Sequence, residues 1–322
     1  MTLARRPVLR LLAAAAALAA ATGAFAQSDF PNKPVKVIVP FAAGGPADNY
    51  ARFIAQRLGD ALKQPFVVDN KPGAGSVIGT DLVAKSPADG YTLLLMSNTH
   101  TVNETLIPNK PFKLMADFVG VAPINSSDLM LVVHPSVAAK TLPELIALAK
   151  SKPGKMNYAS SGNGTPYHMA GELFKHLAGV DIVHVPYKGS SGARTDVMGG
   201  QVDMMFDAVT TMAPVAKDGK VRALATTGPA RTGDLPTVAE TVPNYEATIW
   251  LGLMAPKGTP QAIVDKLNAE VRKIVAQPDT KAAWTKQGAT PMSMNPSEFT
   301  AYLNKDIEKW GAIVKASGIK PE

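Results

Sequence analysis

Short apolar runs alternate along the chain with segments in which apolar residues recur every three or four positions. The first run, residues 35–39, precedes a segment at 48–62 that carries Ala51, Ile54 and Leu58 on one face. A short apolar run is typical of a buried strand, and the wider spacing is typical of an amphipathic helix. Because this order of strand, glycine-rich loop and helix recurs, we expect an α/β fold of mostly parallel sheets with helices on both faces.

The same alternation continues in the second half of the chain. A strand is predicted at 129–133, and residues 141–144 form a capping-box pattern that opens the next helix. Further strands are predicted at 66–68, 92–96, 156–159, 184–185, 202–206, 223–226 and 249–254, and further helices at 76–85, 98–106, 166–177 and 190–198. Near the C-terminus, Pro260 opens one helix, and Asn295 or Ser297 caps a final amphipathic one.

The first 26 residues have the pattern of a secretory signal peptide. Arg5, Arg6 and Arg10 precede an alanine- and leucine-rich stretch at 11–21, and small residues lead up to Ala26. This pattern predicts export to the periplasm with cleavage near Ala26, because so short a stretch does not span a membrane. Arg5 and Arg6 also resemble a twin-arginine signal, so the Sec and twin-arginine routes both stay open.

Length and composition favour two domains and exclude several classes of partner. Removing 26 of the 322 residues leaves 296, which exceeds the size at which one core usually stops growing. The net charge of +7 falls to +4 without the three leader arginines, and the basic residues are scattered, so we expect no nucleic-acid partner. The chain has no cysteine, which excludes disulfides and a lipid-anchored lipoprotein. We expect a monomer.

The most informative segment lies between the first predicted strand and helix, at residues 41–45. Gly44 and Gly45 leave backbone N–H groups accessible at the positive end of a helix dipole, which forms an anion site without a basic side chain. We expect Asp48 to cap this helix. An ordinary tight turn is the alternative, and this loop alone does not decide between the two.

A second glycine-rich loop, at residues 160–165, precedes Pro166 in the other half of the chain. Hydroxyl groups, an amide and two glycines again surround the start of a helix. If the two halves face each other across a cleft, both helix starts can converge on one carboxylate.

Other motifs do not support a catalytic or cofactor site. Residues 73–79 have the spacing GxGxxxG and do not follow the first strand, so a structural turn is favoured over a dinucleotide site. The chain has no GxSxG elbow of an esterase. His168 and His176 are eight residues apart on one predicted helix, about 12 Å at 1.5 Å per residue, and cannot hold one metal ion together. We therefore expect no enzyme activity, no cofactor and no metal.

Several motifs, in order along the chain, resemble one known family. They are Pro40-Phe41-x-x-Gly44-Gly45-x-x-Asp48-x-x-Ala51-Arg52, Asn70-Lys71-Pro72-Gly73-Ala74-Gly75, Asp89-Gly90-Tyr91-Thr92-Leu93, Ser161-Gly162-Asn163-Gly164-Thr165-x-x-His168, Val185-Pro186-Tyr187-Lys188-Gly189, Gly200-Gln201-Val202-Asp203 and Gly219-Lys220-Val221-Arg222-Ala223-Leu224. The chain resembles the Bug family of TctC-like solute-binding proteins, which serve tripartite tricarboxylate transporters. The resemblance covers the whole mature chain.

The resemblance implies a type II periplasmic-binding-protein fold, in which two lobes of mostly parallel sheet are joined by two crossing strands. These strands would lie near residues 119–124 and 241–249. Lobe 1 would comprise residues 27–124 and 247–322, and lobe 2 residues 125–246. A ligand would bind in the cleft between the lobes.

The resemblance also assigns ligand binding to both glycine loops, whose amides would hold a carboxylate. The residues carried over are Phe41, Ala42, Ala43, Gly44, Gly45, Ser160, Ser161, Gly162, Asn163, Gly164 and Thr165, together with Asp48 and His168. Asn98 and Asp207 are added because they lie at the carboxyl ends of predicted strands, where open α/β sheets bind ligands. Ala43 stands where many members have proline, which would loosen the first loop.

The function that follows is capture of a mono-, di- or tricarboxylate, aromatic acids included, and its delivery to the membrane permease subunits of a tripartite transporter. Phe41, Tyr167 and Asp128 are candidates for the residues that select the acid. Two alternatives stay open: a sensor that presents its ligand to a membrane signalling system, and an exported hydrolase. Turnover of candidate esters would identify the hydrolase.

Overall fold

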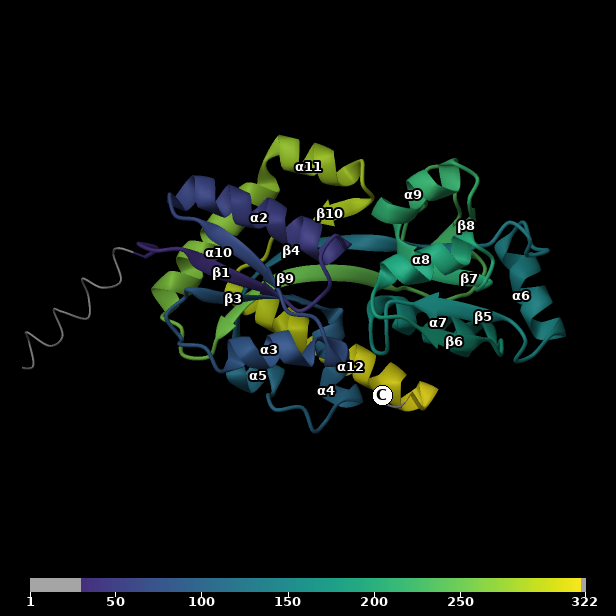
Figure 1. Ribbon diagram of the computed structural model, residues 1–322, viewed down its shortest axis with the longest axis horizontal. Helices are drawn as coiled ribbons and strands as arrows, with labels where there is room; N and C mark the ends of the chain where they lie inside the picture. Colours follow the sequence, from purple (N-terminus) through teal and green to yellow (C-terminus); the bar gives the residue numbers. More distant parts are fainter. Residues whose placement is uncertain (1–29, 320–322) are drawn as a thin grey trace, which may run out of the picture.

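The computed structural model describes residues 30–319, and the predicted leader, residues 1–26, lies outside them. Two α/β lobes lie side by side, with long strands running between them (Figure 1). The lobe on the left of Figure 1 is built mainly from the two ends of the chain, and the lobe on the right from its middle. The expected two-lobed α/β fold is confirmed. Each helix within residues 30–319 is too short or too polar to cross a membrane.

The left-hand lobe contains parallel and antiparallel strands. The parallel strands follow the order β2 (Phe66–Asn70), β1 (Val35–Val39) and β3 (Thr92–Ser97). Antiparallel to them, β9 (Thr248–Pro256) pairs with β3, the long strand β4 (Phe118–Val133) pairs with β9, and β10 (Ala289–Pro291) pairs with β4. The helices are α2 (Pro46–Leu62), α3 (Val77–Ala84), α4 (Asn98–Leu106), α5 (Leu114–Asp117), α10 (Gln261–Ala276), α11 (Pro278–Thr285) and α12 (Pro296–Ser317), with the short 3₁₀ helix η1 (Ala74–Ser76).

The right-hand lobe repeats this plan. The second part of β4 pairs antiparallel with β7 (Met204–Ala208) and β8 (Arg222–Thr226). β7 also pairs parallel with β5 (Asn157–Ser160), which in turn pairs parallel with β6 (Val183–Pro186). The helices are α6 (Leu142–Ser151), α7 (Pro166–Ala178), α8 (Ser190–Met198) and α9 (Val209–Lys217), with the 3₁₀ helix η2 (Val238–Glu240). The sheets are therefore mixed rather than mostly parallel, because the strands that connect the lobes run in opposite directions.

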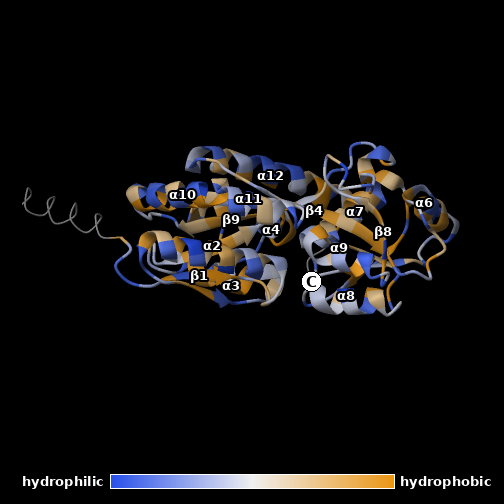
Figure 2. Cartoon of the chain, turned by 90° about the horizontal axis from the view of Figure 1, so that it is seen from above, coloured by the Kyte–Doolittle hydropathy of each residue, from blue (hydrophilic) through white to orange (hydrophobic). Residues whose placement is uncertain are grey.

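Alternating side chains of each strand pack against helices on opposite faces. Val37 and Val39 of β1 are buried in one apolar cluster with Ile54 of α2, whereas Ile38 is buried in another with Val83 of α3. Figure 2 shows apolar strands inside and polar helix faces outside. This layering follows because successive side chains of a strand point to opposite faces, and both faces need cover.

Strand β4 belongs to both sheets. Up to Asp128 it pairs with β9, and from Leu129 onward it pairs with β7 and β8. The return crossing lies next to it, because Thr248 at the start of β9 pairs with Asp128. β4 thus continues beyond residues 119–124 before it changes partners, and the lobe boundaries at 124/125 and 246/247 stay a prediction.

The final helix, α12, contacts both lobes. It packs against α4 in the left-hand lobe, and its Trp310 and Val314 belong to the apolar cluster that includes Phe174 of the right-hand lobe. Asn295 caps this helix, because its side chain accepts a hydrogen bond from the amide of Glu298 (2.9 Å). The first of the two expected caps is therefore confirmed.

Candidate functional site

The two glycine loops lie at the carboxyl ends of parallel strands, one in each lobe. Loop one (residues 41–45) joins β1 to α2, and loop two (residues 160–165) joins β5 to α7. A Cβ atom built on Gly189, the residue before α8, would lie 4.0 Å from the Cβ of Ala42 in loop one. A Cβ built on Gly164 of loop two would lie 2.6 Å from the side chain of Leu106 in α4. The lobes thus touch beside both loops, so the loops lie at the interlobe junction.

Asp48 holds loop one in a way that differs from the prediction. Gly45, in an extended conformation, is the N-cap of α2, and Pro46 follows it as the first helical residue. Asp48 therefore lies inside the first turn, where Oδ2 accepts from the Gly44 amide (3.0 Å) and from Arg52 Nε (3.0 Å). The prediction that Asp48 caps the helix is wrong, because proline suits the first helical position and places the cap at Gly45.

The charge of Asp48 is matched by Arg52, one turn further along α2. Burial alone would raise the pKa of Asp48, but hydrogen bonds from Arg52 and from the Gly44 amide outweigh it and lower the pKa. Asp48 is thus an ionised carboxylate whose main partner is Arg52. Gly44 has φ +79°, a conformation that favours glycine, so this turn requires a glycine at position 44.

Four backbone amides of loop one have no acceptor among residues 30–319. The N–H groups of Phe41, Ala42, Ala43 and Gly45 donate no hydrogen bond there, and Ala42 and Ala43 are exposed. The loop is nonetheless fixed, because Asn70 Nδ2 donates to the Phe41 carbonyl (3.1 Å). Unpaired amides at the positive end of a helix attract an anion.

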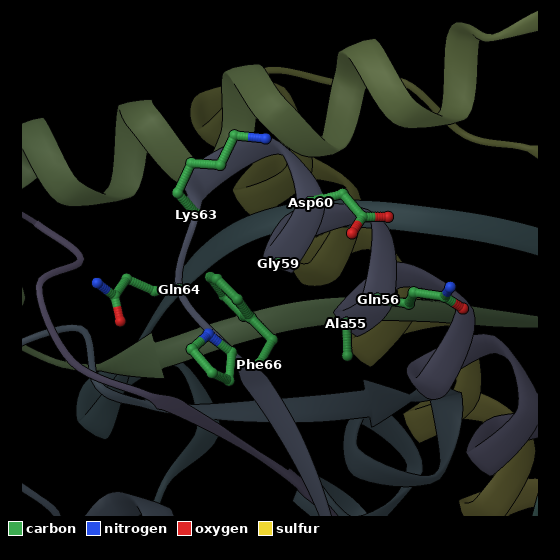
Figure 3. A pocket seen from close by; sticks show the side chains of 8 residues that line it. Ala55, Gln56, Gly59, Asp60, Lys63, Gln64 and Phe66 are labelled. Atoms are coloured by element: carbon green, nitrogen blue, oxygen red, sulfur yellow. The ribbon is translucent and has the colours of Figure 1, made fainter.

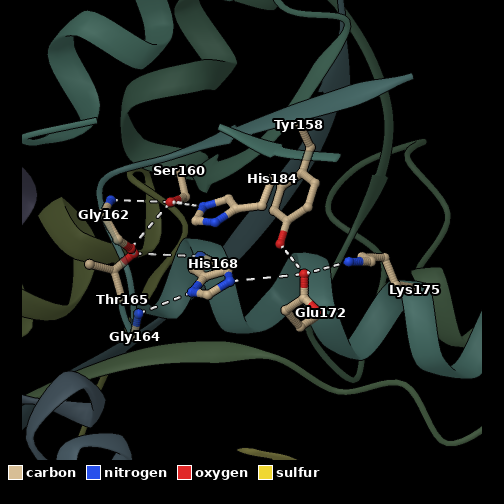
Figure 4. A network of polar contacts seen from close by, with 9 residues as sticks. All are labelled: Tyr158, Ser160, Gly162, Gly164, Thr165, His168, Glu172, Lys175 and His184. Atoms are coloured by element: carbon tan, nitrogen blue, oxygen red, sulfur yellow. Dashed lines mark hydrogen bonds and ion pairs between the residues drawn. The ribbon is translucent and has the colours of Figure 1, made fainter. Parts of the chain in front are cut away.

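Hydrogen bonds from side chains hold loop two in place (Figure 4). The hydroxyl of Ser160 accepts from the Gly162 amide (3.1 Å), and Thr165 Oγ1 donates to the Gly162 carbonyl (2.7 Å). Nδ1 of His168 accepts from the Gly164 amide (3.0 Å). Ser160, Thr165 and His168 therefore shape the loop through its backbone.

Loop two also presents unpaired amides. The N–H groups of Ser161 and Asn163 make no hydrogen bond within the described part of the chain. Gly162 and Gly164 on either side have φ +126° and +70°, which other residues disfavour. The conformations of these two glycines thus leave the amides of Ser161 and Asn163 without an acceptor in the described part of the chain.

Two stacked imidazoles support loop two. The ring centroids of His168 and His184 lie 3.8 Å apart with 5° between the ring planes, and His184 Nε2 lies 2.6 Å from Ser160 Oγ. Burial lowers the pKa of His168 to about 4 and that of His184 to about 3, so both rings are neutral near pH 7. The neutral form is required because Nδ1 of His168 accepts the hydrogen bond of an amide.

Glu172 completes the network behind the histidines. Its Oε1 accepts from the Tyr158 hydroxyl (2.6 Å) and from Lys175 Nζ (3.0 Å), and lies 3.9 Å from His168 Nε2. Lys175 matches the charge of this buried carboxylate, so His168 need not be protonated. Sequence reasoning did not assign His184 to the site, because β6 is a separate strand and His184 belongs to no local motif.

The two residues predicted from strand ends lie deeper in the molecule. Asn98, the first residue of α4, donates from Nδ2 to the Thr248 carbonyl (3.0 Å), while its buried Oδ1 has no partner within residues 30–319. Asp207, at the end of β7, is fully buried and accepts from Arg194 Nε (2.5 Å) and from the Ala208 amide (2.8 Å). Burial raises the pKa of Asp207, and the charge of Arg194 opposes this. Sequence reasoning did not find Arg194.

The arrangement favours reversible anion binding over catalysis. Ser160 and His184 are close enough to form a nucleophile and base, but Ser160 is fully buried and the lowered pKa makes His184 a weak base. Within residues 30–319, no group of three metal-ligating side chains is placed to hold an ion. What the junction offers is backbone N–H groups from both lobes.

One family model matches most of the chain. It is described as the tripartite tricarboxylate transporter family receptor, and the match covers residues 50–319. The chain belongs to this receptor family. Protein BugT of Bordetella pertussis is 37% identical to the receptor over 319 residues, which cover 97% of each chain. The resemblance to the Bug family is thereby confirmed.

Two solved structures share the fold of the receptor. R. palustris Rpa4515, solved with adipate, is 34% identical with a TM-score of 0.87, and the match covers 91% of the receptor and 100% of that chain. MatC from Rhodopseudomonas palustris, solved with bound malate, is 32% identical with a TM-score of 0.82, and the match covers 88% and 100%. The expected binding-protein fold is therefore confirmed.

Two other features of the receptor are a surface hollow and the GxGxxxG segment. The second lies beside both loops, because a Cβ built on Gly79 would lie 2.9 Å from Pro40 and one built on Gly75 would lie 4.0 Å from the Asn163 carbonyl. A surface hollow near the C-terminal end of α2 is lined by Gln56, Asp60 and Lys63 (Figure 3), whereas loop one precedes the other end of this helix. In the GxGxxxG segment, a Cβ on Gly79 would lie 2.7 Å from the Lys71 carbonyl. That glycine allows close packing of α3, as expected for a structural turn.

Proposed function

We propose that the receptor is exported to the periplasm, binds a small carboxylate between loops one and two, and delivers it to the membrane subunits of a tripartite transporter. The observation that carries this proposal is the set of amides without an acceptor among residues 30–319, four in loop one and two in loop two, at the starts of α2 and α7. The relatives solved with adipate and malate support a carboxylate ligand.

Such a site uses backbone dipoles in place of basic side chains. A carboxylate has about four lone-pair positions, so one group can accept N–H donors from both loops together. A ligand that bonds both loops stabilises the arrangement in which the lobes touch, because only that arrangement offers all the donors. In this proposal the lobes move apart where β4 changes partners, and the receptor acts as a monomer.

A sensing role would use the same binding site, so its test is cellular. A transporter receptor loses its effect on carboxylate uptake when the membrane subunits are deleted, whereas a sensor still changes gene expression. We favour transport because the family is defined by its transporter.

Calorimetric titration of the purified mature protein tests the proposal. The probes are adipate, malate, citrate and benzoate, with adipamide and 1,6-hexanediol as neutral controls. We expect heat of binding and a raised melting temperature for at least one acid and none for the neutral controls, since ligand at 100 times its Kd stabilises by about 2.7 kcal/mol. Binding of adipamide as tight as that of adipate would contradict an anion site.

A further inference from the structure

Neither glycine loop contains a basic residue, but Arg194 brings a basic side chain to the interlobe junction. It lies in the second turn of α8, the helix whose preceding residue, Gly189, stands beside Ala42 of loop one. Its Nε donates to Asp207 (2.5 Å) and its Nη2 donates to Ser190 Oγ (2.6 Å). The guanidinium is therefore fixed from two sides, by the end of β7 and by the first turn of its own helix.

The fixed guanidinium still has donors to spare. A guanidinium carries five N–H groups, and among the described residues Nη1 donates to no protein atom. The side chain of Arg194 is 17% exposed, whereas that of Asp207 is completely buried. Of this ion pair, only the side chain of Arg194 is therefore accessible from outside.

Two tyrosines link this guanidinium to the starts of α2 and α7. Tyr167 is the second residue of α7, directly after loop two, and Tyr50 is in the second turn of α2, after loop one. Burial first, and then the charge of Asp207, raise the pKa of Tyr167 well above its usual value, and the Arg194 charge and Tyr50 are also close enough to affect it. Along their helices, Tyr50 lies about 7.5 Å beyond the end of loop one and Tyr167 about 3 Å beyond the end of loop two, at 1.5 Å per residue.

We propose that Arg194 anchors a second carboxylate of the ligand, so that the receptor selects dicarboxylates over monocarboxylates of equal length. This inference rests on the proposed function, in which the loop amides hold the first carboxylate. Asp207 is a positioning residue: it orients the guanidinium and leaves the Nη edge to the ligand. A charged donor pairs with a carboxylate more strongly than a neutral one, which gives the far end of the site its selectivity.

The opposing interpretation is that the buried pair of Arg194 and Asp207 only attaches α8 to β7. The two interpretations differ in what a substitution changes. A purely structural pair affects stability, and any loss of affinity is then shared by all ligands. An anchor changes the ratio of the affinities for a diacid and its matching monoacid.

The test compares adipate with hexanoate by calorimetry, because these six-carbon acids differ only in the second carboxylate. Arg194→Gln alone would leave Asp207 buried without its partner, so the main variant is Arg194→Gln with Asp207→Asn, which keeps a neutral hydrogen-bonded pair. Arg57→Gln, which removes a surface arginine of α2 that pairs with Asp279, is the control.

We expect the wild type to bind adipate at least tenfold more tightly than hexanoate, as one charged hydrogen bond provides about ten- to hundredfold. In the double variant adipate binding falls to the level of hexanoate, and hexanoate binding is unchanged. The inference is overturned if the double variant keeps the wild-type ratio, or if the wild type shows no preference. If the wild type binds neither these acids nor the others in the screen, the proposed function fails and this inference fails with it.

Discussion

At the residue scale, the shape of loop two depends on the protonation of His168. Its Nδ1 accepts from the Gly164 amide, and its ring stacks on that of His184. A protonated imidazole donates from both nitrogens, so it cannot accept this bond, and two stacked cations would repel each other. The burial that lowers both pKa values therefore also keeps the loop in its binding conformation.

Acid should destabilise the receptor through these histidines. The pKa of His168 is about 4 in the folded protein and about 6.5 in an unfolded chain, so the unfolded state binds more protons between these values. The free energy of unfolding should thus fall as the pH drops from about 6.5 to about 4. His168→Asn, which keeps an acceptor near the position of Nδ1 and does not titrate, should lose less stability, by on the order of 1–3 kcal/mol.

Urea unfolding of both proteins at pH 7, 6, 5 and 4.5 measures this difference. The carboxyls with raised pKa values, Asp128, Asp207 and Asp306, are present in both proteins and cancel in the comparison. His176→Asn, at an exposed position of α7, is the control and should follow the wild type. An equal loss of stability in wild type and His168→Asn would show that protonation of His168 does not contribute to the acid dependence of the free energy of unfolding.

Local signals in the sequence predict the loops but not their supports. Gly44, Gly45 and the glycines of loop two are recognisable because they directly precede a predicted helix, whose first amides have no partner within the helix. The actual cap was also readable from Pro46, since proline favours the first helical position. His184 and Arg194 reach the site from other elements, and no spacing in the sequence brings them together.

At the element scale, the position of α7 depends on its contact with β5. A Cβ on Gly171 in the middle of α7 would lie 2.2 Å from the ring of Tyr158 on β5. The absence of a side chain at Gly171 lets the helix approach the sheet closely, and Tyr158 in turn donates to Glu172. This contact sets where the first turn of α7, and hence loop two, lies.

Gly171→Ala should therefore destabilise the receptor by about 1–3 kcal/mol and weaken carboxylate binding, because the overpacked helix must shift or displace the Tyr158 ring. Gly192→Ala in α8 is the matched control for helix propensity: its Cβ would lie 3.2 Å from the side chain of Tyr187, which is partly exposed and can move. Both substitutions gain about 1 kcal/mol of helix propensity, and only Gly171→Ala should show a net loss in urea unfolding. Equal effects of the two variants would contradict this account of α7.

At the scale of the whole molecule, β4 connects the lobes more continuously than its sequence suggests. The apolar pattern predicts a strand only at 129–133, because Gly120, Pro123 and the polar residues after Ile124 interrupt it. The crossing near 119–124 was expected only from the family resemblance. The structure includes these residues in one strand by shifting the register between Gly120 and Ala122 and again between Pro123 and Asn125. Bulges of this kind accommodate proline inside a sheet, and they depend on the partner strand, which local sequence does not reveal.

The α/β class was predictable from the order of strands and helices, and two lobes from chain length and the family resemblance, whereas the contacts between the lobes were not. Gly189 meets Ala42 beside loop one, and a Cβ on Gly288 next to β10 would lie 2.7 Å from Val209 of α9. These contacts join segments far apart in the sequence. They place loop amides from both lobes at one junction, which is the basis of the claim that one carboxylate bridges them.

Calorimetric titration of charge-inserted variants tests this claim most directly. Ala43→Glu puts a carboxylate at the free amides of loop one, with Ala43→Gln as a control of equal size, and Asn163→Asp does the same at loop two relative to the native amide. A like charge about 4 Å from the ligand costs about 4 kcal/mol at an effective dielectric constant of 20, so even partial screening leaves more than a tenfold loss. We predict that Ala43→Glu and Asn163→Asp each weaken adipate binding at least tenfold, while Ala43→Gln stays near the wild type. Wild-type affinity in either charged variant would contradict a carboxylate held between the two loops.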